Sequence, residues 1–500
     1  MNKPRLIIAG PGSGKTHDFV DQILTCMESL EPYRTLAAIT YTNAATASIK
    51  ERLEKKIKLP PNVFIGTTYS FFNAFILLPF ASVFGLVEMD KLFIDYDIDE
   101  KAEEITKKKG FPDPVKRLMY KNVVAANLKK ALLRKGIVPF DQIAKISSEL
   151  IIDKKIRSLV GERLQYLFID EFQDATSHQY TVFDQIRKEK KTAIYAVGDP
   201  EQYISNYTLK RAKPKFSSLP IISFKNSSDV EVKDINRRSS VTITKFINNF
   251  NTQVQQKTEY TGITTTGVYF LTCTDLDVIV EIFREVSKEV EKEPEYKRFY
   301  LAQTNAAYSS VSNKYNLKPF SNENLKPQSK LLEALKLLCD IAHLPSNKFR
   351  ETHKLTALEH RILGIKLINE QISTKEEFVA FIHDQLKVKI SNEINIERLF
   401  KLFLEIKSHT TEPSCRELTS SIHKSKGLEA DAVLVLAKSN NQLGKWLETN
   451  INLRHNDKTD EHRLGFVAFS RAKEILCIAC LEPLNNVNKA KLDGFQILYR

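Results

Sequence analysis

Short apolar runs recur along the chain, each bounded by turn residues or by polar stretches with helical periodicity. Continuous runs rich in branched and aromatic residues are typical of buried parallel strands in an α/β fold. The predicted strands are Leu6 to Ala9, Leu36 to Thr40, Val63 to Gly66, Tyr166 to Ile169, Ala193 to Val197, Val268 to Thr272, Phe299 to Ala302, Ala432 to Leu436 and Ile475 to Ala479. They fall into two groups, which predicts two parallel sheets.

Two strand-poor stretches interrupt this pattern and are predicted to be mainly helical insertions. Residues 316–413 carry helical patterns such as Lys330 to Ile341 and Lys375 to Leu386. Residues 75–164 are also helical and are rich in lysine, namely Lys107, Lys108, Lys109, Lys116, Lys121, Lys129, Lys130 and Lys135. A solvated helix face and a surface that holds phosphates explain these lysines equally well.

The segment Ala9 to Thr16, AGPGSGKT, lies between the first predicted strand and a helical pattern from Asp18 to Leu30. This context is that of a phosphate-binding loop, in which glycines let backbone N–H groups turn toward phosphate oxygens. The candidate nucleotide-binding residues are Gly10, Pro11, Gly12, Ser13, Gly14, Lys15 and Thr16. Lys15 would reach the outer phosphates of ATP, and the Thr16 hydroxyl would ligate Mg²⁺. The strict pattern has glycine where this chain has Ala9.

Two carboxylates follow the apolar strand that ends at Ile169, which places Asp170 and Glu171 at the carboxyl edge of the predicted sheet. Asp170 is predicted to hold Mg²⁺ through water. Glu171 is predicted to orient and deprotonate the attacking water. Acidic residues at strand ends also occur as helix caps, so this pair by itself does not decide between the two interpretations.

Further motifs follow in a fixed order. They are TYTNAA at 40–45, IDEFQD at 169–174, VGDPEQ at 197–202, NRRS at 236–239, HKSKGLE at 423–429 and VAFSRA at 467–472. With the phosphate-binding loop, this series resembles the UvrD/Rep branch of superfamily 1 helicases. The resemblance runs over roughly residues 5–480 and implies two RecA-like domains with ATP bound in the cleft between them.

The resemblance also implies domain limits and residue roles. The first RecA-like domain is expected at 1–74 and 165–235 and the second at 236–315 and 414–500, with insertions at 75–164 and 316–413. Gln202 would lie on the first wall of the ATP site, and Arg238 and Arg471 would face it from the second. Guanidinium groups supplied across a cleft neutralise developing phosphoryl charge. Glu429 matches the family position that approaches the nucleotide ribose.

In this family, single-stranded DNA crosses the tops of both domains, where aromatic side chains stack on bases whatever their sequence. The corresponding tyrosines are Tyr41, Tyr69 and Tyr207, and Thr42, Asn43, Thr67 and His423 are further candidates for DNA contact or motif coupling. Ordinary packing is the alternative interpretation for each tyrosine.

Composition narrows the list of partners. The formal net charge of +13 at pH 7 favours a polyanion such as single-stranded or tailed DNA. No apolar run approaches the length of about 20 residues that a membrane-spanning helix needs, so we expect a cytoplasmic protein without a membrane partner. Cys477 and Cys480 are spaced like zinc ligands, but we interpret them as residues of a buried strand.

The chain departs from its family in two respects. A glutamine motif that reads adenine usually precedes the phosphate-binding loop, yet only eight residues precede Ala9 here, so other nucleoside triphosphates remain candidates. The insertions are also shorter than in full-length members. Compact members of the family serve as helicase-like subunits of bacterial anti-phage systems, where the partner is an OLD-family nuclease.

Two functions therefore remain open at the level of sequence. The chain is either an ATP-driven translocase or helicase on single-stranded DNA, or a regulatory subunit that senses nucleotide and DNA ends and switches a partner nuclease with little unwinding. A small-molecule kinase would leave Gln202, Arg238 and Arg471 without a role.

Overall fold

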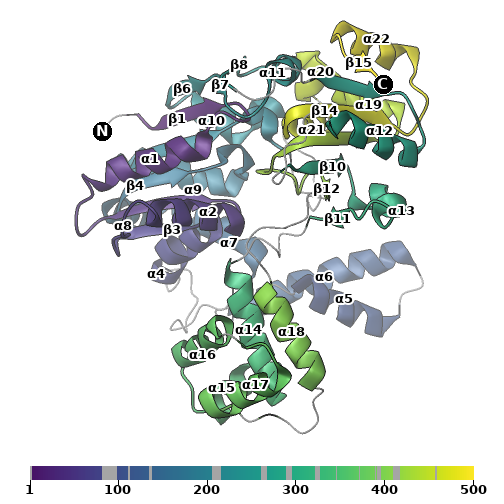
Figure 1. The fold of residues 1–500 in the computed structure, drawn as a ribbon. Helices are drawn as coiled ribbons and strands as arrows, with labels where there is room; N and C mark the ends of the chain where they lie inside the picture. Colours follow the sequence, from purple (N-terminus) through teal and green to yellow (C-terminus); the bar gives the residue numbers. More distant parts are fainter. Residues whose placement is uncertain are drawn as a thin grey trace. The chain divides into compact units, whose positions relative to one another are not determined.

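The computed structural model describes most of the chain: residues 3–80, 98–110, 113–134, 138–204, 215–260, 267–288, 296–320, 327–344, 346–370, 372–388, 390, 396–408, 417–456 and 459–500. The chain divides into two compact units (Figure 1). The larger comprises Met1–Leu317 and Thr419–Arg500, and the smaller comprises Lys318–Leu418.

Among the described residues, the N-terminal part of the larger unit contains a parallel sheet with strand order β3-β2-β4-β5-β1-β6. Its strands are β1 (Arg5–Ala9), β2 (Thr35–Thr40), β3 (Val63–Thr67), β4 (Leu164–Ile169), β5 (Ala193–Gly198) and β6 (Asp229–Lys233). Every pairing between neighbours is parallel. The five strands predicted in this region are confirmed, and β6 was missed.

Helices cover both faces of this sheet, as the alternation of strand side chains requires. Ile7 and Ala9 of β1 pack in one core with α1 (Lys15–Met27) and α2 (Asn43–Glu54). Leu6 and Ile8 pack in the other. That second core also receives side chains from α3 (Thr68–Phe72), η1 (Asn73–Leu77), α7 (Ile143–Leu150), α8 (Lys154–Arg163), α9 (Ser177–Glu189) and α10 (Pro220–Lys225).

The C-terminal part of the larger unit contains a second sheet, in which the strand order from β12 onward is β12-β10-β13-β14-β9-β15. The strands are β9 (Val268–Leu271), β10 (Arg298–Ala302), β12 (Glu417–Ser421), β13 (Ala430–Ala437), β14 (Ala472–Cys480) and β15 (Leu498–Tyr499). The pairings from β10 to β15 are parallel. The four strands predicted here are confirmed, and Cys477 and Cys480 are buried in β14 as expected.

The second sheet is also covered by helices. One core joins its strands to α12 (Leu276–Lys288) and to Tyr308 and Val311. The other helices of this region are α11 (Val241–Asn248), α13 (Ser309–Ser312), α19 (Asn440–Trp446), α20 (Ile451–Asn456), α21 (Glu461–Phe469) and α22 (Asn486–Gly494). β7 (Ile235–Asn236) and β8 (Lys257–Thr258) form a short parallel pair, with α11 between them in the sequence.

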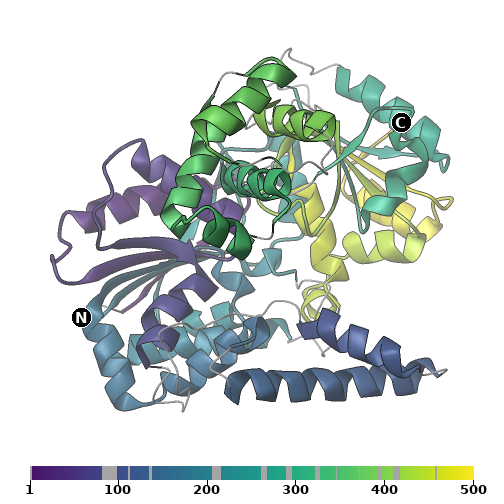
Figure 2. The ribbon, with the colours of Figure 1, turned by 90° about the horizontal axis from the view of Figure 1, so that it is seen from below.

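The lysine-rich stretch contains α5 (Ile98–Lys109) and α6 (Pro114–Arg134), which pack side by side (Figure 2). The eight lysines named above include some that are in ion pairs: Lys108 with Glu104, Lys121 with Glu103, and Lys129 with Asp141. Lys135 lies outside the described residues. The paired lysines accord with a solvated helix face, at least at those positions.

The smaller unit has its own apolar core. Its helices are α14 (Pro327–Ala342), α15 (Ser346–Thr352), α16 (Ala357–Asn369), α17 (Lys375–Ala380), η9 (Phe381–Gln385) and α18 (Ile396–Ser408). The two helical patterns predicted in this region correspond to α14 and to α17 with η9. The predicted class, α/β with two parallel sheets and mainly helical insertions, is confirmed.

Both bounds of the first helix differ from the prediction. The pattern ran from Asp18 to Leu30, whereas α1 spans Lys15–Met27. The start differs because glycine, in the left-handed conformation at Gly14 (φ 79°), supplies the turn into the helix without a polar capping side chain. In the part of the chain that the structure describes, no helix combines the length and apolar character needed to span a membrane.

Candidate active site

The loop after β1 has the backbone geometry of an anion-binding turn. Gly12 and Gly14 both have positive φ, 71° and 79°. At Gly12 a Cβ atom would come within 2.5 Å of the Asn236 Oδ1 atom, so a larger residue does not fit. The Ser13 hydroxyl donates to the Gly10 carbonyl at 2.8 Å and the Lys15 ammonium to the Ala9 carbonyl at 3.0 Å. The loop therefore leads into the N-terminus of α1, where backbone N–H groups and the helix dipole favour a phosphate.

Strand order brings the acidic motifs to this loop. β5 lies between β1 and β4, and all three strands run in the same direction, so their carboxyl ends share one edge of the sheet. Asp170 follows β4 and Asp199 follows β5, and both side chains are buried. The residues predicted to handle phosphate and metal thus come together at this edge.

Buried Asp170 and partly buried Glu171 form a pair of carboxyl groups with unequal acidity. Burial, together with the neighbouring Glu171 charge, raises the pKa of Asp170 to about 7. Burial acts against ionisation of Glu171 too, but Lys426 and Lys15 outweigh it and lower the pKa of that carboxyl. Glu171 adopts a left-handed backbone (φ 50°), which is uncommon for a residue other than glycine. Its carboxylate accepts a hydrogen bond from the Gln173 side chain.

This donor set fits a Mg²⁺ ion. Buried carboxylate oxygens are hard ligands, and the high pKa of Asp170 shows that its charge lacks full compensation from the protein. The Thr16 hydroxyl lies in the first turn of α1, next to Lys15. Asp170 and Thr16 are the residues that would hold the ion.

Gln202 and Arg471 join the two sheets. The Gln202 amide donates to Asp199 Oδ2 at 2.8 Å and accepts from Arg471 Nη2 at 3.0 Å. Arg471, between α21 and β14, also donates to the Val467 carbonyl at 2.9 Å. Burial and the neighbouring Arg238 lower the pKa of Arg471 to about 9, which leaves the guanidinium charged at neutral pH.

Arg238 approaches from the segment after β7. Its Nε donates to Glu429 at 2.6 Å and its Nη1 to the Ser470 carbonyl at 3.1 Å. Lys473 forms a second ion pair with Glu429 at 3.1 Å. Burial alone would raise the pKa of Glu429, but Arg238 and Lys473 hold it below its ordinary value. The predicted ribose-side residue is thus paired with two cations.

Several residues at the site were not singled out from the sequence. Lys426, within the HKSKGLE motif, pairs with Asp174 and lies 4.0 Å from Glu171. Gln256 donates to the Pro11 carbonyl at 2.9 Å. Lys426 sits in a motif that was recognised, so its charge beside two acidic motif residues was the available signal. Gln256 lies outside every motif and gave none.

The residues predicted to contact DNA fall into two structural groups. Tyr41 and Tyr69 are partly buried against the N-terminal core, and the Tyr69 ring packs on Phe140 with centroids 4.3 Å apart. Thr42 and Thr67 cap helices, because their hydroxyls accept from Ala45 N at 3.1 Å and Ser70 N at 3.2 Å. Asn43 is exposed and His423 is partly buried. Tyr207 lies outside the described residues. A role in DNA binding stays a prediction for all of them.

Comparisons with known proteins agree with this arrangement. Residues 1–208 match the profile of an AAA domain, and residues 201–482 match that of the UvrD-like helicase C-terminal domain. The Gabija protein GajB of Bacillus cereus (strain VD045) is 24% identical over 95% of this chain and 92% of its own length. The ATP-dependent DNA helicase Rep of Buchnera aphidicola subsp. Acyrthosiphon pisum is 27% identical over 49% of this chain, which spans 42% of Rep. The second profile covers more than half of the chain and includes the segment that carries Arg238 and Arg471, so the chain belongs to the UvrD-like helicase family.

Proposed function

We propose that this chain is a DNA-dependent ATPase that uses Mg²⁺-ATP to move along single-stranded DNA, 3′ to 5′ as its family resemblance implies. The observation that carries the proposal is the hydrogen bond from Arg471 to Gln202. It joins the sheet that bears the phosphate-binding loop to the second sheet of the same unit. A guanidinium in this position is suited to neutralising phosphoryl charge when a nucleotide is bound.

The chemistry follows from the residues around that bond. The loop N–H groups and Lys15 would hold the phosphates. Mg²⁺, held by Thr16 and Asp170, would neutralise phosphate charge. The charge of Lys426 keeps Glu171 ionised, as a base that accepts a proton from water must be. Arg238 and Arg471 would stabilise the charge that develops on the transferred phosphoryl group.

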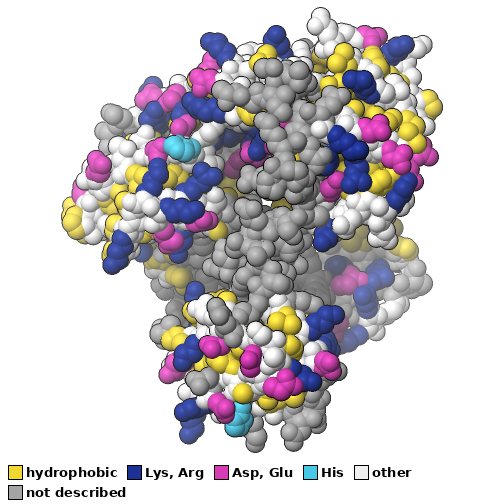
Figure 3. All heavy atoms as spheres, in the orientation of Figure 1, with side chains coloured by type: hydrophobic (Ala, Val, Ile, Leu, Met, Phe, Trp, Pro, Cys, Tyr) yellow, Lys and Arg dark blue, Asp and Glu magenta, His cyan; other side chains and the backbone are white. Residues whose placement is uncertain are grey.

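The surface is compatible with a polyanionic partner. Lys and Arg side chains are spread over the described part of the face in Figure 3, with acidic side chains between them. Over the whole sequence, Lys and Arg outnumber Asp and Glu and give a formal net charge of +13. If the protein binds DNA mainly through its phosphates, its affinity for DNA depends strongly on salt concentration.

The similarity to a Gabija protein along almost the whole chain supports a finer proposal. We place this chain in anti-phage defence, as the motor subunit beside an OLD-family nuclease. The regulatory alternative, in which the nuclease is switched with little unwinding, is distinguished by whether the purified chain separates a tailed duplex without a partner.

The first test is phosphate release by the purified protein with and without a single-stranded oligonucleotide, with ATP and GTP in parallel. We expect strong stimulation by DNA that declines steeply as salt is raised, and loss of turnover in Lys15→Ala. Turnover that is indifferent to DNA contradicts the motor. GTP turnover equal to that of ATP establishes that the site does not select the base.

A further inference from the structure

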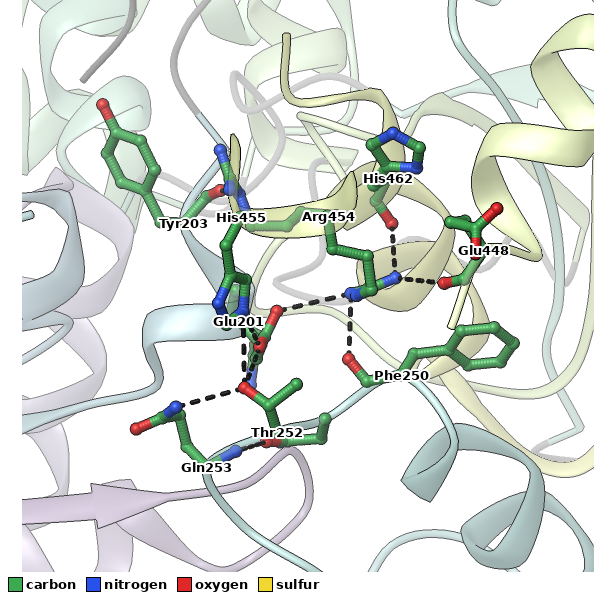
Figure 4. Close-up of polar contacts among 12 residues, drawn as sticks. Glu201, Tyr203, Phe250, Thr252, Gln253, Glu448, Arg454, His455 and His462 are labelled. Atoms are coloured by element: carbon green, nitrogen blue, oxygen red, sulfur yellow. Dashed lines mark hydrogen bonds and ion pairs between the residues drawn. The ribbon is translucent and has the colours of Figure 1, made fainter. Parts of the chain in front are cut away.

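Glu201 is a fully buried acid directly before Gln202, and no step of the chemistry above uses it. Its backbone N–H donates to Asp199 Oδ1 at 3.1 Å, and Gln202 donates to the other oxygen of the same carboxylate at 2.8 Å. The Asp199 carboxylate therefore holds both Glu201 and Gln202 in place. The Glu201 carboxylate is directed toward Thr252 and α20 (Figure 4).

Three donors surround the Glu201 carboxylate. Thr252 Oγ1 donates to Oε1 at 2.6 Å, His455 Nε2 lies 2.9 Å from the same oxygen, and Arg454 Nη2 lies 3.3 Å from Oε2 (Figure 4). Because an ionised carboxylate only accepts hydrogen bonds, the His455 Nε2 atom is the donor. Burial would raise the pKa of Glu201, but His455 and Arg454 outweigh it and lower it, so the carboxylate is charged at neutral pH.

Arg454 is itself fixed by backbone groups of the C-terminal region. It is fully buried and donates to the carbonyls of Phe250, Glu448 and His462 at 2.9, 3.1 and 3.2 Å (Figure 4). The His455 ring stacks on Phe216, with centroids 3.7 Å apart. A buried ion pair adds little net stability, because desolvation offsets the attraction, but separating its partners is costly since it leaves a buried charge uncompensated.

The segment Asp199–Gln202 is thus tied to the second sheet's region at two points. Arg454 and His455 on α20 hold Glu201, and Arg471 after α21 holds Gln202. The two attached residues, Glu201 and Gln202, are consecutive in the sequence. A change in the position of α20 relative to β5 would therefore move the Gln202 amide with respect to Arg471.

We propose that Glu201, held by Arg454 and His455, is a positioning residue that sets the Gln202 amide against Arg471 and so couples the C-terminal domain to ATP turnover. The inference rests on the proposed ATPase function. It assigns Glu201 no contact with nucleotide, so removing its charge should lower kcat and leave the KM for ATP nearly unchanged.

The primary test is Glu201→Gln in the full-length chain, measured as DNA-stimulated ATP turnover. Misplacement by a fraction of an ångström is costly at a reacting centre, so we expect kcat to fall about tenfold or more while KM for ATP changes less than about twofold. Glu189→Gln is the matched control, because Glu189 pairs with Arg157 at 2.9 Å within the N-terminal helices. The control should keep kcat within about twofold.

A pair of substitutions at His455 separates the hydrogen bond from the packing. His455→Phe keeps a ring to stack on Phe216 and loses the donor, whereas His455→Gln keeps an N–H donor and loses the ring. Loss of a hydrogen bond to a charged group corresponds to about tenfold, so kcat should fall by about that factor in the Phe variant and be largely retained in the Gln variant. This pair also decides the question if Glu201→Gln does not fold.

The outcomes are distinct. A kcat near the wild-type value in folded Glu201→Gln, or a Phe variant more active than the Gln variant at His455, overturns the positioning role and leaves the ATPase proposal intact. Absence of DNA-stimulated turnover in the wild-type chain overturns the proposed function itself. A lower melting temperature with unchanged kcat assigns Glu201 a purely structural role and also overturns the inference.

Discussion

The two sheets of the larger unit contribute opposite charges to the candidate active site. The N-terminal sheet carries buried acids at its carboxyl edge, Asp170 after β4 and Asp199 after β5. The region of the C-terminal sheet contributes cations, among them Lys426, Arg454 and Arg471. The phosphate-binding loop with Lys15 is the N-terminal sheet's own positive element.

This difference explains why neither half of the site is electrostatically complete. Burial is the main cause that raises the pKa values of Asp174 and Asp199 to about 6, although nearby lysines act against it. For Asp174 the main compensating charge is that of Lys426, which lies 252 residues away in the sequence. Binding of a nucleotide and its metal at this junction therefore changes the charge balance of both halves together.

The largest effect is expected from the acid that would act as base. Glu171→Gln retains shape and hydrogen bonding but cannot accept a proton, so the turnover rate should fall by about 10³-fold. Nucleotide binding should persist, since the phosphate-binding loop is unchanged. Single-turnover phosphate release beside binding of a fluorescent ATP analogue measures both. Substantial turnover in this variant would move the base role to another residue.

The next largest effect is expected from Arg471, a cation contributed by the region of the C-terminal sheet. Arg471→Lys keeps a positive charge but cannot reach Gln202 and the Val467 carbonyl together, so turnover should fall by about 10²-fold. Arg157→Lys, in an ion pair with Glu189 on the N-terminal helices, is the control and should turn over ATP normally. If Lys at 471 supports near-normal rates, charge alone is required and the geometry of the guanidinium is not.

Sequence reasoning succeeded where a local signal was strong. Most residues of eight of the nine predicted strands are buried, and such continuous apolar runs stand out in a sequence, whereas β3 is only partly buried. β6 was missed because it has exposed residues and no apolar run marks it, as is common at the edge of a sheet, where β6 lies beside β1 among the described strands. β12 escaped because its sequence, ELTSS, is mainly polar.

The site divides in the same way. The phosphate-binding loop, Asp170 and Glu171 belong to contiguous motifs, so the order of residues along the chain was enough to predict them. The ion pair between Glu201 and Arg454 joins residues 253 positions apart, and neither position shows a local pattern that predicts the other. For Tyr41 and Tyr69 the motif position was recognised, but it did not reveal that both side chains are partly buried against the N-terminal core.

A smaller effect, on stability, is expected from removing Lys426, which forms an ion pair with Asp174 from the region of the other sheet. Lys426→Met leaves the partly buried Asp174 without its ion-pair partner. Since both side chains are about one-fifth exposed, the loss should be about 2 kcal/mol in the free energy of unfolding at pH 7.5. Below pH 6 Asp174 takes up a proton, so the loss should shrink. Urea unfolding at pH 7.5 and pH 5 measures this. The double variant Asp174→Asn with Lys426→Met should recover most of the loss, and failure to do so would place the cost elsewhere.

The smallest effect concerns an acid whose burial opposes stability. The pKa of Asp199 is raised from its ordinary 3.8 to about 6, mainly by burial, with Lys15 acting in the other direction. An acid with a raised pKa weakens the folded state as pH rises from about 4 to 6, and the full cost of up to about 3 kcal/mol is present above pH 6. Asp199→Asn removes this cost, but its amide cannot accept from Glu201 N and Gln202 Nε2 as the carboxylate does. A lost hydrogen bond offsets part of the gain, so the net increase in the free energy of unfolding above pH 6 should be about 1 kcal/mol.

Below pH 4 the sign should reverse, because wild-type Asp199 is then protonated and bears no burial cost while the variant still lacks a hydrogen bond. Urea unfolding of both proteins at pH 3.5 and pH 8, without nucleotide or Mg²⁺, tests the crossing. Turnover of Asp199→Asn should fall despite its greater stability, because a reoriented Gln202 amide no longer accepts from Arg471. A variant that is less stable than wild type at pH 8 would show that the cations near Asp199 compensate its charge more fully than its raised pKa implies.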